Sequence, residues 1–260
     1  MSTTQPATTA RPKSRDQGHV GLRRIAIVPA YNEQDSIAKV IAELRAADPE
    51  FEVVVVDDGS IDRTAAEARR AGAQVIRLPY NLGIGGAVQT GYQYALEHGF
   101  DIAFQLDGDG QHDPRQLDAI LEPVARGEAD VVIGSRFLGL GQYHVPFVRR
   151  LGMTIFARLV SAIVRQPLSD TSSSFRAVNR RAIKLFAHEY PHGYLETVEA
   201  TVMASRYGLR LMGVPVVVRQ RMFGHSSLTV PLASFYAFKV FVAVFISLFR
   251  RTTFQLEEDA

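Results

Sequence analysis

The sequence contains no cysteine, and this absence removes several kinds of chemistry at once. Disulfide bonds, thiolate zinc sites and cysteine nucleophiles are excluded, which fits a reducing compartment. The N-terminal stretch also lacks the apolar core of a signal peptide, being rich in Thr, Ser, Pro and Arg instead. We therefore expect residues 1–22 to be a disordered tail and the working face of the protein to be cytoplasmic.

The net charge of the chain is also small. The 29 basic and 27 acidic residues leave a formal charge of +2, so no basic field indicates nucleic acid as a partner. With 260 residues, 47% of them hydrophobic, the chain is long enough to bury a full core. These values predict one large globular domain with short appendages.

Apolar runs alternate with helical patterns along the first half of the chain. We expect strands over residues 24–29, 51–56, 73–78 and 102–106, and helices over 30–47, 63–70 and from the glycines at 83–86 to residue 98. Asp62 is expected to cap the second helix. Such alternation predicts βαβ units and therefore an α/β fold, with a mostly parallel sheet and helices on both faces.

Polar or glycine-rich loops follow each of these four strands. Ligands of an open α/β sheet bind beyond the carboxyl ends of its strands, so the four loops are predicted to meet in one crevice. Taken alone, Asp57 or Asp58 before Gly-Ser is also ordinary turn chemistry. The loops are Pro29 to Glu33, Asp57-Asp58, the run around Gly83, and Asp107 to Asp113.

The fourth loop, in the stretch FQLDGDGQHDP, carries an oxygen-bearing side chain at every second position. Alternate residues of an extended segment point the same way, so Asp107, Asp109, Gln111 and Asp113 can converge. Hard oxygen ligands without thiolates favour Mg²⁺ or Mn²⁺, which leave coordination positions open for phosphates. A solvated acidic turn is the alternative for such a short motif.

The order PAYNE, VVVVDDGS, NLGIGGA, LDGDGQHDP and IGSRF resembles the family 2 glycosyltransferases of GT-A fold, most closely the polyprenyl-phosphate (dolichyl-phosphate) sugar synthases. The resemblance covers about residues 24–227. It implies that Asp107 and Gly108 lie near the ribose and diphosphate of a nucleotide-sugar, and that Asp109 and Gln111 hold the divalent metal. The residues that it implies for the nucleotide pocket are Pro29, Tyr31, Glu33, Asp57 and Asp58.

Arginines in the second half are candidates for binding phosphate. Arg136 follows a predicted strand at 130–133 and is expected either to hold a phosphate in the crevice or to form a surface ion pair. Residues 145–165 form a basic amphipathic helix, which suits a membrane surface or a core-packing role. The resemblance makes Arg149 or Arg150 a ligand of the acceptor phosphate, and Arg221 a residue that closes over the diphosphate, although Ser227 stands where many relatives have Lys.

Two carboxylates on a predicted helix over 193–207 are candidate bases. Glu196 and Glu199 are three residues apart and share one face. A salt-bridged helix face is the alternative role for the two glutamates.

Three further elements are expected in this part of the chain. They are a short strand after the polar loop at 170–176, a helix at 179–186 and a strand at 209–218.

The apolar run at 232–249, followed by Arg250 and Arg251, predicts a membrane-associated helix. Its rise of about 27 Å is borderline for a full span, so it either lies in the interface or packs against a small integral membrane protein. The expected organisation is a tail at 1–22, a GT-A domain at 23–230, the helix at 231–251 and a polar tail at 252–260.

Together these features predict an inverting, metal-dependent transfer of a sugar from a UDP- or GDP-sugar to polyprenyl phosphate at the cytoplasmic face of a membrane. Asp107, Asp109, Arg136 and Arg221 would carry the reaction. Transfer to a saccharide hydroxyl is the alternative; it needs a base, for which Glu196, Glu199 and Asp113 are the candidates. A non-catalytic membrane scaffold that only binds nucleotide-sugar is the rival from another class.

Overall fold

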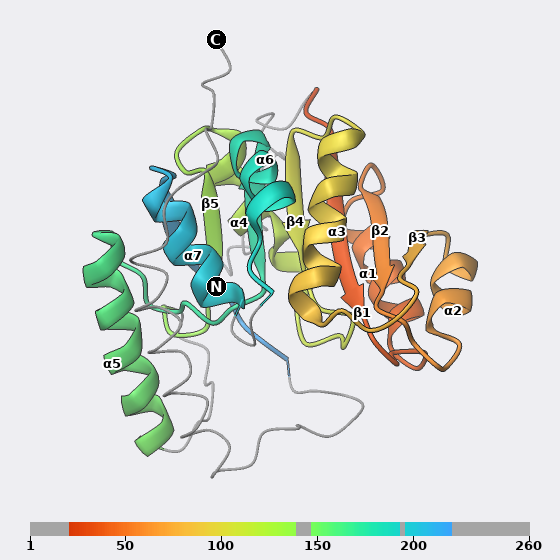
Figure 1. The fold of residues 1–260 in the computed structure, drawn as a ribbon, viewed down its shortest axis with the longest axis horizontal. Helices are drawn as coiled ribbons and strands as arrows, with labels where there is room; N and C mark the ends of the chain where they lie inside the picture. The colour runs from red at the N-terminus through yellow and green to blue at the C-terminus, as the bar shows by residue number, and fades with distance from the viewer. Residues whose placement is uncertain (1–20, 139–146, 193–195, 220–260) are drawn as a thin grey trace, which may run out of the picture.

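The computed structural model describes residues 21–138, 147–192 and 196–219. Seven strands form one sheet in the order β3-β2-β1-β4-β6-β5-β7, with helices packed against both of its faces (Figure 1). The strands are β1 Arg24–Ala30, β2 Glu52–Asp57, β3 Gln74–Arg77, β4 Ile102–Gln105, β5 Val131–Ser135, β6 Arg176–Asn179 and β7 Leu211–Pro215. The helices are α1 Ile37–Ala47, α2 Thr64–Arg70, α3 Ile84–Glu97, α4 Leu117–Ala125, α5 Phe147–Val164, α6 Arg180–Glu189 and α7 Glu196–Arg206, with a 3₁₀ turn η1 at Pro114–Gln116.

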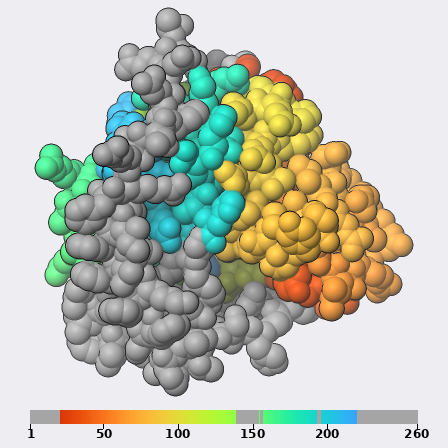
Figure 2. Space-filling view, in the orientation of Figure 1, coloured from red at the N-terminus to blue at the C-terminus, as the bar shows by residue number. Residues whose placement is uncertain are grey.

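Strand β1 is apolar from Ile25 to Ala30 because both faces of the sheet are covered. Along β1, Ile25 and Ile27 join one core cluster with residues of α3, α6 and α7, whereas Ala26 and Val28 join a second cluster with α1 and α4. This alternation is the two-residue period of a strand. Figures 1 and 2 show α3 and α6 side by side on the first face, where Tyr92 packs against Phe186 with ring centroids 5.2 Å apart.

The α/β prediction is confirmed, and the pairing adds one feature that the sequence did not show. β1 pairs in parallel with β2 and β4, as the βαβ pattern requires. β6, however, lies antiparallel between β4 and β5, so the sheet is mixed in its second half. Helix α4 was also not predicted, although its buried residues follow a helical period.

The predicted start of the first helix is wrong. The chain turns through residues 31–36, with Asn32 in the left-handed region at φ 55°, and α1 begins only at Ile37. Tertiary hydrogen bonds explain the delay: the amide of Asn32 donates to Ser60 Oγ at 2.9 Å, and the amide of Glu33 donates to Thr64 Oγ1 at 2.8 Å. These bonds, to Ser60 in the loop after β2 and to Thr64 at the start of α2, replace the first turn of a helix.

In the described parts of the chain, none of the helices is both long and apolar enough to cross a bilayer. The predicted helix at 231–251 and the polar tail at 252–260 lie outside the described residues, as do residues 1–20.

Candidate active site

A cavity of about 650 Å³ opens at the carboxyl ends of β1, β2 and β4. All four predicted loops contribute to its wall, so the prediction that they meet in one crevice is confirmed. The remaining wall comes from the loop before β6 and from the first residues of α7. The lining residues that the argument uses are Tyr31, Glu33, Asp58, Gly83, Asp107, Gly108, Asp109, Ser172, Ser174, Glu196 and Thr197.

The two aspartates after β2 have different positions. The carboxylate of Asp58 faces the cavity and accepts hydrogen bonds from the amides of Leu82, at 2.7 Å, and Gly83, at 3.0 Å. Burial raises the pKa of Asp58, against the opposing effect of these two bonds. Asp57 is fully buried and does not line the cavity; its Oδ1 accepts from the Ser60 amide at 3.1 Å. Asp57 therefore shapes the turn, and Asp58 is the aspartate that a ligand can reach.

Gly83 marks the start of α3 at the cavity wall. Its φ of 82° lies in the region that favours glycine, and the chain enters the helix at the next residue. A Cβ atom on Gly85 would lie 2.4 Å from the carbonyl oxygen of Pro191. The glycine run thus allows close backbone approach at a helix start.

The acidic loop after β4 presents two carboxylates to the cavity, from Asp107 and Asp109. Asp107 Oδ2 accepts a 2.6 Å hydrogen bond from Ser174 Oγ. Asp109 Oδ1 accepts from the amide of Gln111 at 3.0 Å, which closes the turn. The half-buried Gln111 does not itself line the cavity.

This loop fits a divalent cation whose coordination is completed by substrate. Asp107 and Asp109 are oxygen donors at the cavity wall, with Gln111 beside them, and no thiolate competes. Among residues 21–138, 147–192 and 196–219, no three His, Asp or Glu side chains gather into a metal cluster. A site with so few protein ligands suits Mg²⁺ or Mn²⁺, which retain water or phosphate oxygens.

Asp113 lies at the far end of the acidic loop and is engaged by arginines. Its Oδ2 is 2.6 Å from Arg115 Nη2, and its Oδ1 is 2.8 Å from Arg219 Nη2. The hydrogen bonds from Arg115, with the charge of Arg219, hold the pKa of Asp113 below its usual value. Asp113 is therefore a poor base, and it does not line the cavity.

The segment after β7 is docked along this loop. The amide of Arg219 donates to the carbonyl oxygen of Gln111 at 2.9 Å, and Arg219 Nη1 is 2.6 Å from Glu43 Oε2 on α1. The side chain of Gln116 binds both the N–H and the C=O of Val217. The last described residues of the chain thus hold the acidic loop from its outer side.

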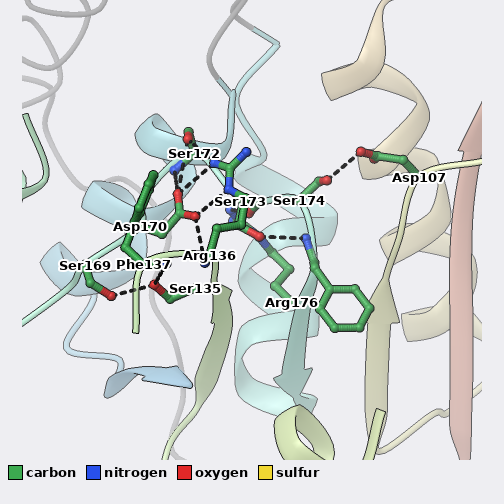
Figure 3. A network of polar contacts seen from close by, with 11 residues as sticks. Asp107, Ser135, Arg136, Phe137, Ser169, Asp170, Ser172, Ser173, Ser174 and Arg176 are labelled. Atoms are coloured by element: carbon green, nitrogen blue, oxygen red, sulfur yellow. Dashed lines mark hydrogen bonds and ion pairs between the residues drawn. The ribbon is translucent and has the colours of Figure 1, made fainter. Parts of the chain in front are cut away.

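A polar loop at 169–175 holds the inner side of the site (Figure 3). Asp170 forms a bidentate ion pair with Arg136, with Oδ2 2.7 Å from Nε and Oδ1 2.9 Å from Nη2, and Ser172 Oγ accepts from the same Nη2 at 2.7 Å. Ser174 of this loop reaches Asp107. Arg136 is thus placed near the crevice in a largely buried ion pair, and it does not line the cavity.

Glu196 begins α7 and faces the cavity, with 6% of its surface exposed. Burial raises the pKa of Glu196 to about 7, against the opposing charge of Arg176. Arg176 on β6 is fully buried, and its Nη2 donates to the carbonyl oxygen of Ser173 at 2.8 Å. Glu199 is half-buried and does not line the cavity, so of the two candidate bases on this helix only Glu196 is in the site.

Several predicted residues cannot be placed. Arg221 lies outside the described residues, and Arg149 and Arg150 lie in the first turn of α5 with side chains that are outside the description. Sequence reasoning gave no role to Asp170, Ser172 and Ser174. The run Asp-Thr-Ser-Ser-Ser before a strand is a signal that could have found them, because such residues cap and bridge loops.

A mixed α/β sheet with a cavity at its strand ends places the chain in the class of GT-A-like folds. The fold matches glucosyl-3-phosphoglycerate synthase from Mycobacterium tuberculosis, solved with Mn²⁺, UDP and phosphoglyceric acid, at a TM-score of 0.67 and 20% identity, over 91% of this chain and 82% of that one. The chain belongs to Glycosyl transferase family 2, whose profile matches residues 25–186.

Two relatives each match 80% of the chain. The undecaprenyl-phosphate mannosyltransferase of Micrococcus luteus is 34% identical over 217 residues, which are 80% of this chain and 88% of the relative. The polyprenol monophosphomannose synthase of Mycolicibacterium smegmatis is 29% identical over 217 residues, 80% of this chain and 81% of the relative. The resemblance to polyprenyl-phosphate sugar transferases is therefore confirmed.

Proposed function

We propose that this enzyme transfers a sugar from a nucleotide-sugar to a polyprenyl phosphate, with inversion at the anomeric carbon. The observation that carries the proposal is the match, over four-fifths of the chain, to a relative named for mannosyl transfer to undecaprenyl phosphate. The cavity supports it because Asp58 and the acidic pair lie along one wall, as a nucleoside and its diphosphate require. The donor is a UDP- or a GDP-sugar.

Asp109 and Gln111 would hold a divalent metal, with Asp107 beside them. A solved protein of the same fold contains Mn²⁺ and UDP. A bound Mg²⁺ or Mn²⁺ supplies charge stabilisation to a leaving diphosphate. The chain's own part is to orient the donor between Asp58 and Asp107 and to keep Asp107 in place through Ser174.

Attack by a phosphate needs no general base. A phosphate monoester is mostly dianionic near neutral pH, because its second pKa is about 6. Its oxygen displaces the nucleoside diphosphate in a single step, which inverts the anomeric centre. Arg136, Arg149 and Arg150 are proposed to bind this acceptor phosphate, and Arg221 to close over the diphosphate of the donor.

We place the reaction at the cytoplasmic face of a membrane, since a polyprenyl acceptor lies in a bilayer. The basic amphipathic pattern of 145–165 and the apolar run at 232–249 support this location, either directly or through a small integral membrane protein. The product would be a lipid-linked sugar used in assembly of cell-envelope glycans or glycolipids.

Transfer to a saccharide hydroxyl is the second candidate, and Glu196 favours it. A carboxyl with a pKa of about 7 inside the cavity is suited to accept a proton at neutral pH. This reaction would make Glu196 indispensable for turnover and would give a product without a lipid phosphate.

The test is incubation of the purified protein and membranes with radiolabelled UDP- and GDP-sugars and polyprenyl phosphate, with and without EDTA. We expect EDTA-sensitive label in the organic phase, stable to mild base and released by mild acid. Label in water-soluble or polymeric glycan would support the hydroxyl acceptor instead. Nucleotide-sugar binding without transfer from any donor would support a scaffold.

A further inference from the structure

Glu196 is a buried carboxyl that the phosphate-acceptor mechanism does not use. It lines the cavity with only 6% of its surface exposed. Within the described ranges, no other side chain forms an ion pair or a hydrogen bond with this carboxyl. A buried carboxyl whose hydrogen-bond donor is its own backbone amide keeps part of its desolvation cost, which a ligand with hydrogen-bond donors would lower.

Arg176 on β6 is a positive charge close enough to Glu196 to affect its pKa. It is fully buried, and its Nη2 donates to the carbonyl oxygens of Ser173, at 2.8 Å, and Thr197, at 3.4 Å. In the described structure its Nε and Nη1 have no hydrogen-bond partner. Burial disfavours the ionised form of Glu196, and this unneutralised cation opposes that effect. The ionised form accepts hydrogen bonds more strongly than the neutral acid.

The strand order indicates which part of the donor reaches Glu196. Along the sheet the cavity wall passes from Asp58 after β2 to Asp107 and Asp109 after β4, and then to Ser174 before β6. With the nucleoside beyond β1 and β2 and the diphosphate at the acidic loop, the next group of the donor lies beyond β6. Glu196 is at that end, because the carbonyl of the adjacent Thr197 is bonded to Arg176 of β6.

The chemistry of the donor agrees with this placement. Phosphate oxygens are acceptors and carry negative charge, so a carboxylate would repel them. Sugar hydroxyls are neutral donors, and a carboxylate with two oxygens can accept from two adjacent hydroxyls. We propose that Glu196 binds hydroxyl groups of the donor sugar and thereby selects the sugar, an inference that rests on the proposed function.

The test compares the binding of a nucleotide-sugar with the binding of its nucleotide alone. UDP-glucose with UDP, and GDP-mannose with GDP, are titrated in the presence of Mn²⁺ into the wild-type protein, Glu196→Ala and Glu196→Gln. Glu199→Gln is the matched control, since Glu199 is on the same helix but outside the cavity. We expect Glu196→Ala to lower the affinity for the more tightly bound nucleotide-sugar by about 10- to 100-fold, as for the loss of one or two hydrogen bonds to an ionised group. The affinity for the nucleotide alone should not change.

Deoxy analogues of that nucleotide-sugar identify the contact. In the wild-type protein, removal of the bonded hydroxyl should cost about 10-fold in affinity, whereas in Glu196→Ala the same removal should cost little, because the two changes delete one interaction. Rescue of part of the affinity in Glu196→Gln, whose amide oxygen still accepts, would agree with this role.

One result would overturn the inference while leaving the proposed function intact, namely equal affinity of wild-type protein and Glu196→Ala for the nucleotide-sugar. A Glu196→Gln variant with unchanged sugar affinity and kcat reduced by orders of magnitude would make Glu196 a base. That result would overturn the inference and would also favour the hydroxyl acceptor over the proposed phosphate acceptor. Failure of the wild-type protein to bind any nucleotide or nucleotide-sugar would overturn the proposed function itself, and this inference with it.

Discussion

The two halves of the cavity wall are stabilised by different balances of bonds. On the side of β1 and β2, backbone amides bind both aspartates: Asp58 accepts from Leu82 and Gly83, and Asp57 accepts from Ser60. The guanidinium of Arg77 adds an ion pair to the buried Asp57, at 3.3 Å. On the side of β5 and β6, a guanidinium binds a carboxylate, as Arg136 does with Asp170.

This difference indicates which side of the site is rigid and on which side an arginine can exchange its carboxylate partner for a phosphate. A backbone amide cannot rotate away from its acceptor, so the proposed nucleotide side is preorganised. A guanidinium fork pairs equally well with the oxygens of a carboxylate or a phosphate. Asp170 therefore presents to Arg136 the same geometry as the phosphate that this arginine is proposed to bind.

The acidic loop lies between the two halves of the cavity wall. We expect a substitution of Asp109 in this loop to have the largest effect on turnover. Asp109→Asn removes the charge of the proposed metal ligand at the cavity wall while keeping the side-chain volume. Turnover should fall by about 100-fold or more, comparable to loss of an electrostatic contact in a transition state. Initial rates at saturating donor measure this, and an unchanged circular dichroism spectrum is the control; full turnover with an intact fold would contradict the metal assignment.

Asp170→Asn removes the ion pair between Asp170 and Arg136 on the side of β5 and β6. Asp170 is 3% exposed, and its removal leaves Arg136 without its bidentate carboxylate. Loss of one partner of a buried ion pair costs about 3 kcal/mol in the free energy of unfolding. Urea unfolding measures this. Ser172→Ala is the matched control, expected to cost about 1 kcal/mol, and equal losses in the two variants would argue against a dominant ion pair.

Glu196→Gln should stabilise the protein at alkaline pH. The pKa of Glu196 is raised from 4.5 to about 7, so the folded state holds this proton more tightly than the unfolded state. Stability from this group is therefore full below the unfolded pKa and is lost as pH rises through the folded pKa, by about 3 kcal/mol at most. Unfolding at about pH 5 and about pH 8 should show a gain for Glu196→Gln only at the higher pH. A similar gain in Glu199→Gln would assign the effect to the helix and not to the cavity.

Asp58→Asn tests the β1 and β2 side with the smallest change. One of its two acceptor oxygens becomes a donor, so one amide of the pair from Leu82 and Gly83 loses its bond. We expect a cost of about 1–2 kcal/mol in unfolding free energy. The donor KM should rise while kcat changes less, and steady-state kinetics separate the two. A stability loss as large as that of Asp170→Asn would remove the contrast between the halves.

The sequence predicted the parallel half of the fold well, because its signals are local. Apolar runs followed by Asp57-Asp58 and by the glycines at 83–86 mark the strand ends, and all four loops met as expected. The start of α1 was missed because Asn32 and Glu33 bind side chains that are 28 and 31 positions away in the sequence.

The second half depends on contacts that no local pattern encodes. Arg136 and Asp170 are 34 residues apart, and Ser174 and Asp107 are 67 apart. The antiparallel direction of β6 is likewise set by its neighbours β4 and β5 and not by its own four residues. Glu196 and Asp113 looked alike as candidate bases, and only burial and the two arginines around Asp113 distinguish them.

The docking of residues 216–219 along the acidic loop has a mechanical consequence. Val217 and Arg219 are bonded to Gln116, Gln111 and Asp113, so the outgoing chain and the loop share one attachment. Tension applied to the chain beyond Arg219 would be transmitted first to the carbonyl of Gln111 and only afterwards to β7. Displacement of residues 216–219 is therefore coupled to the backbone of the acidic loop.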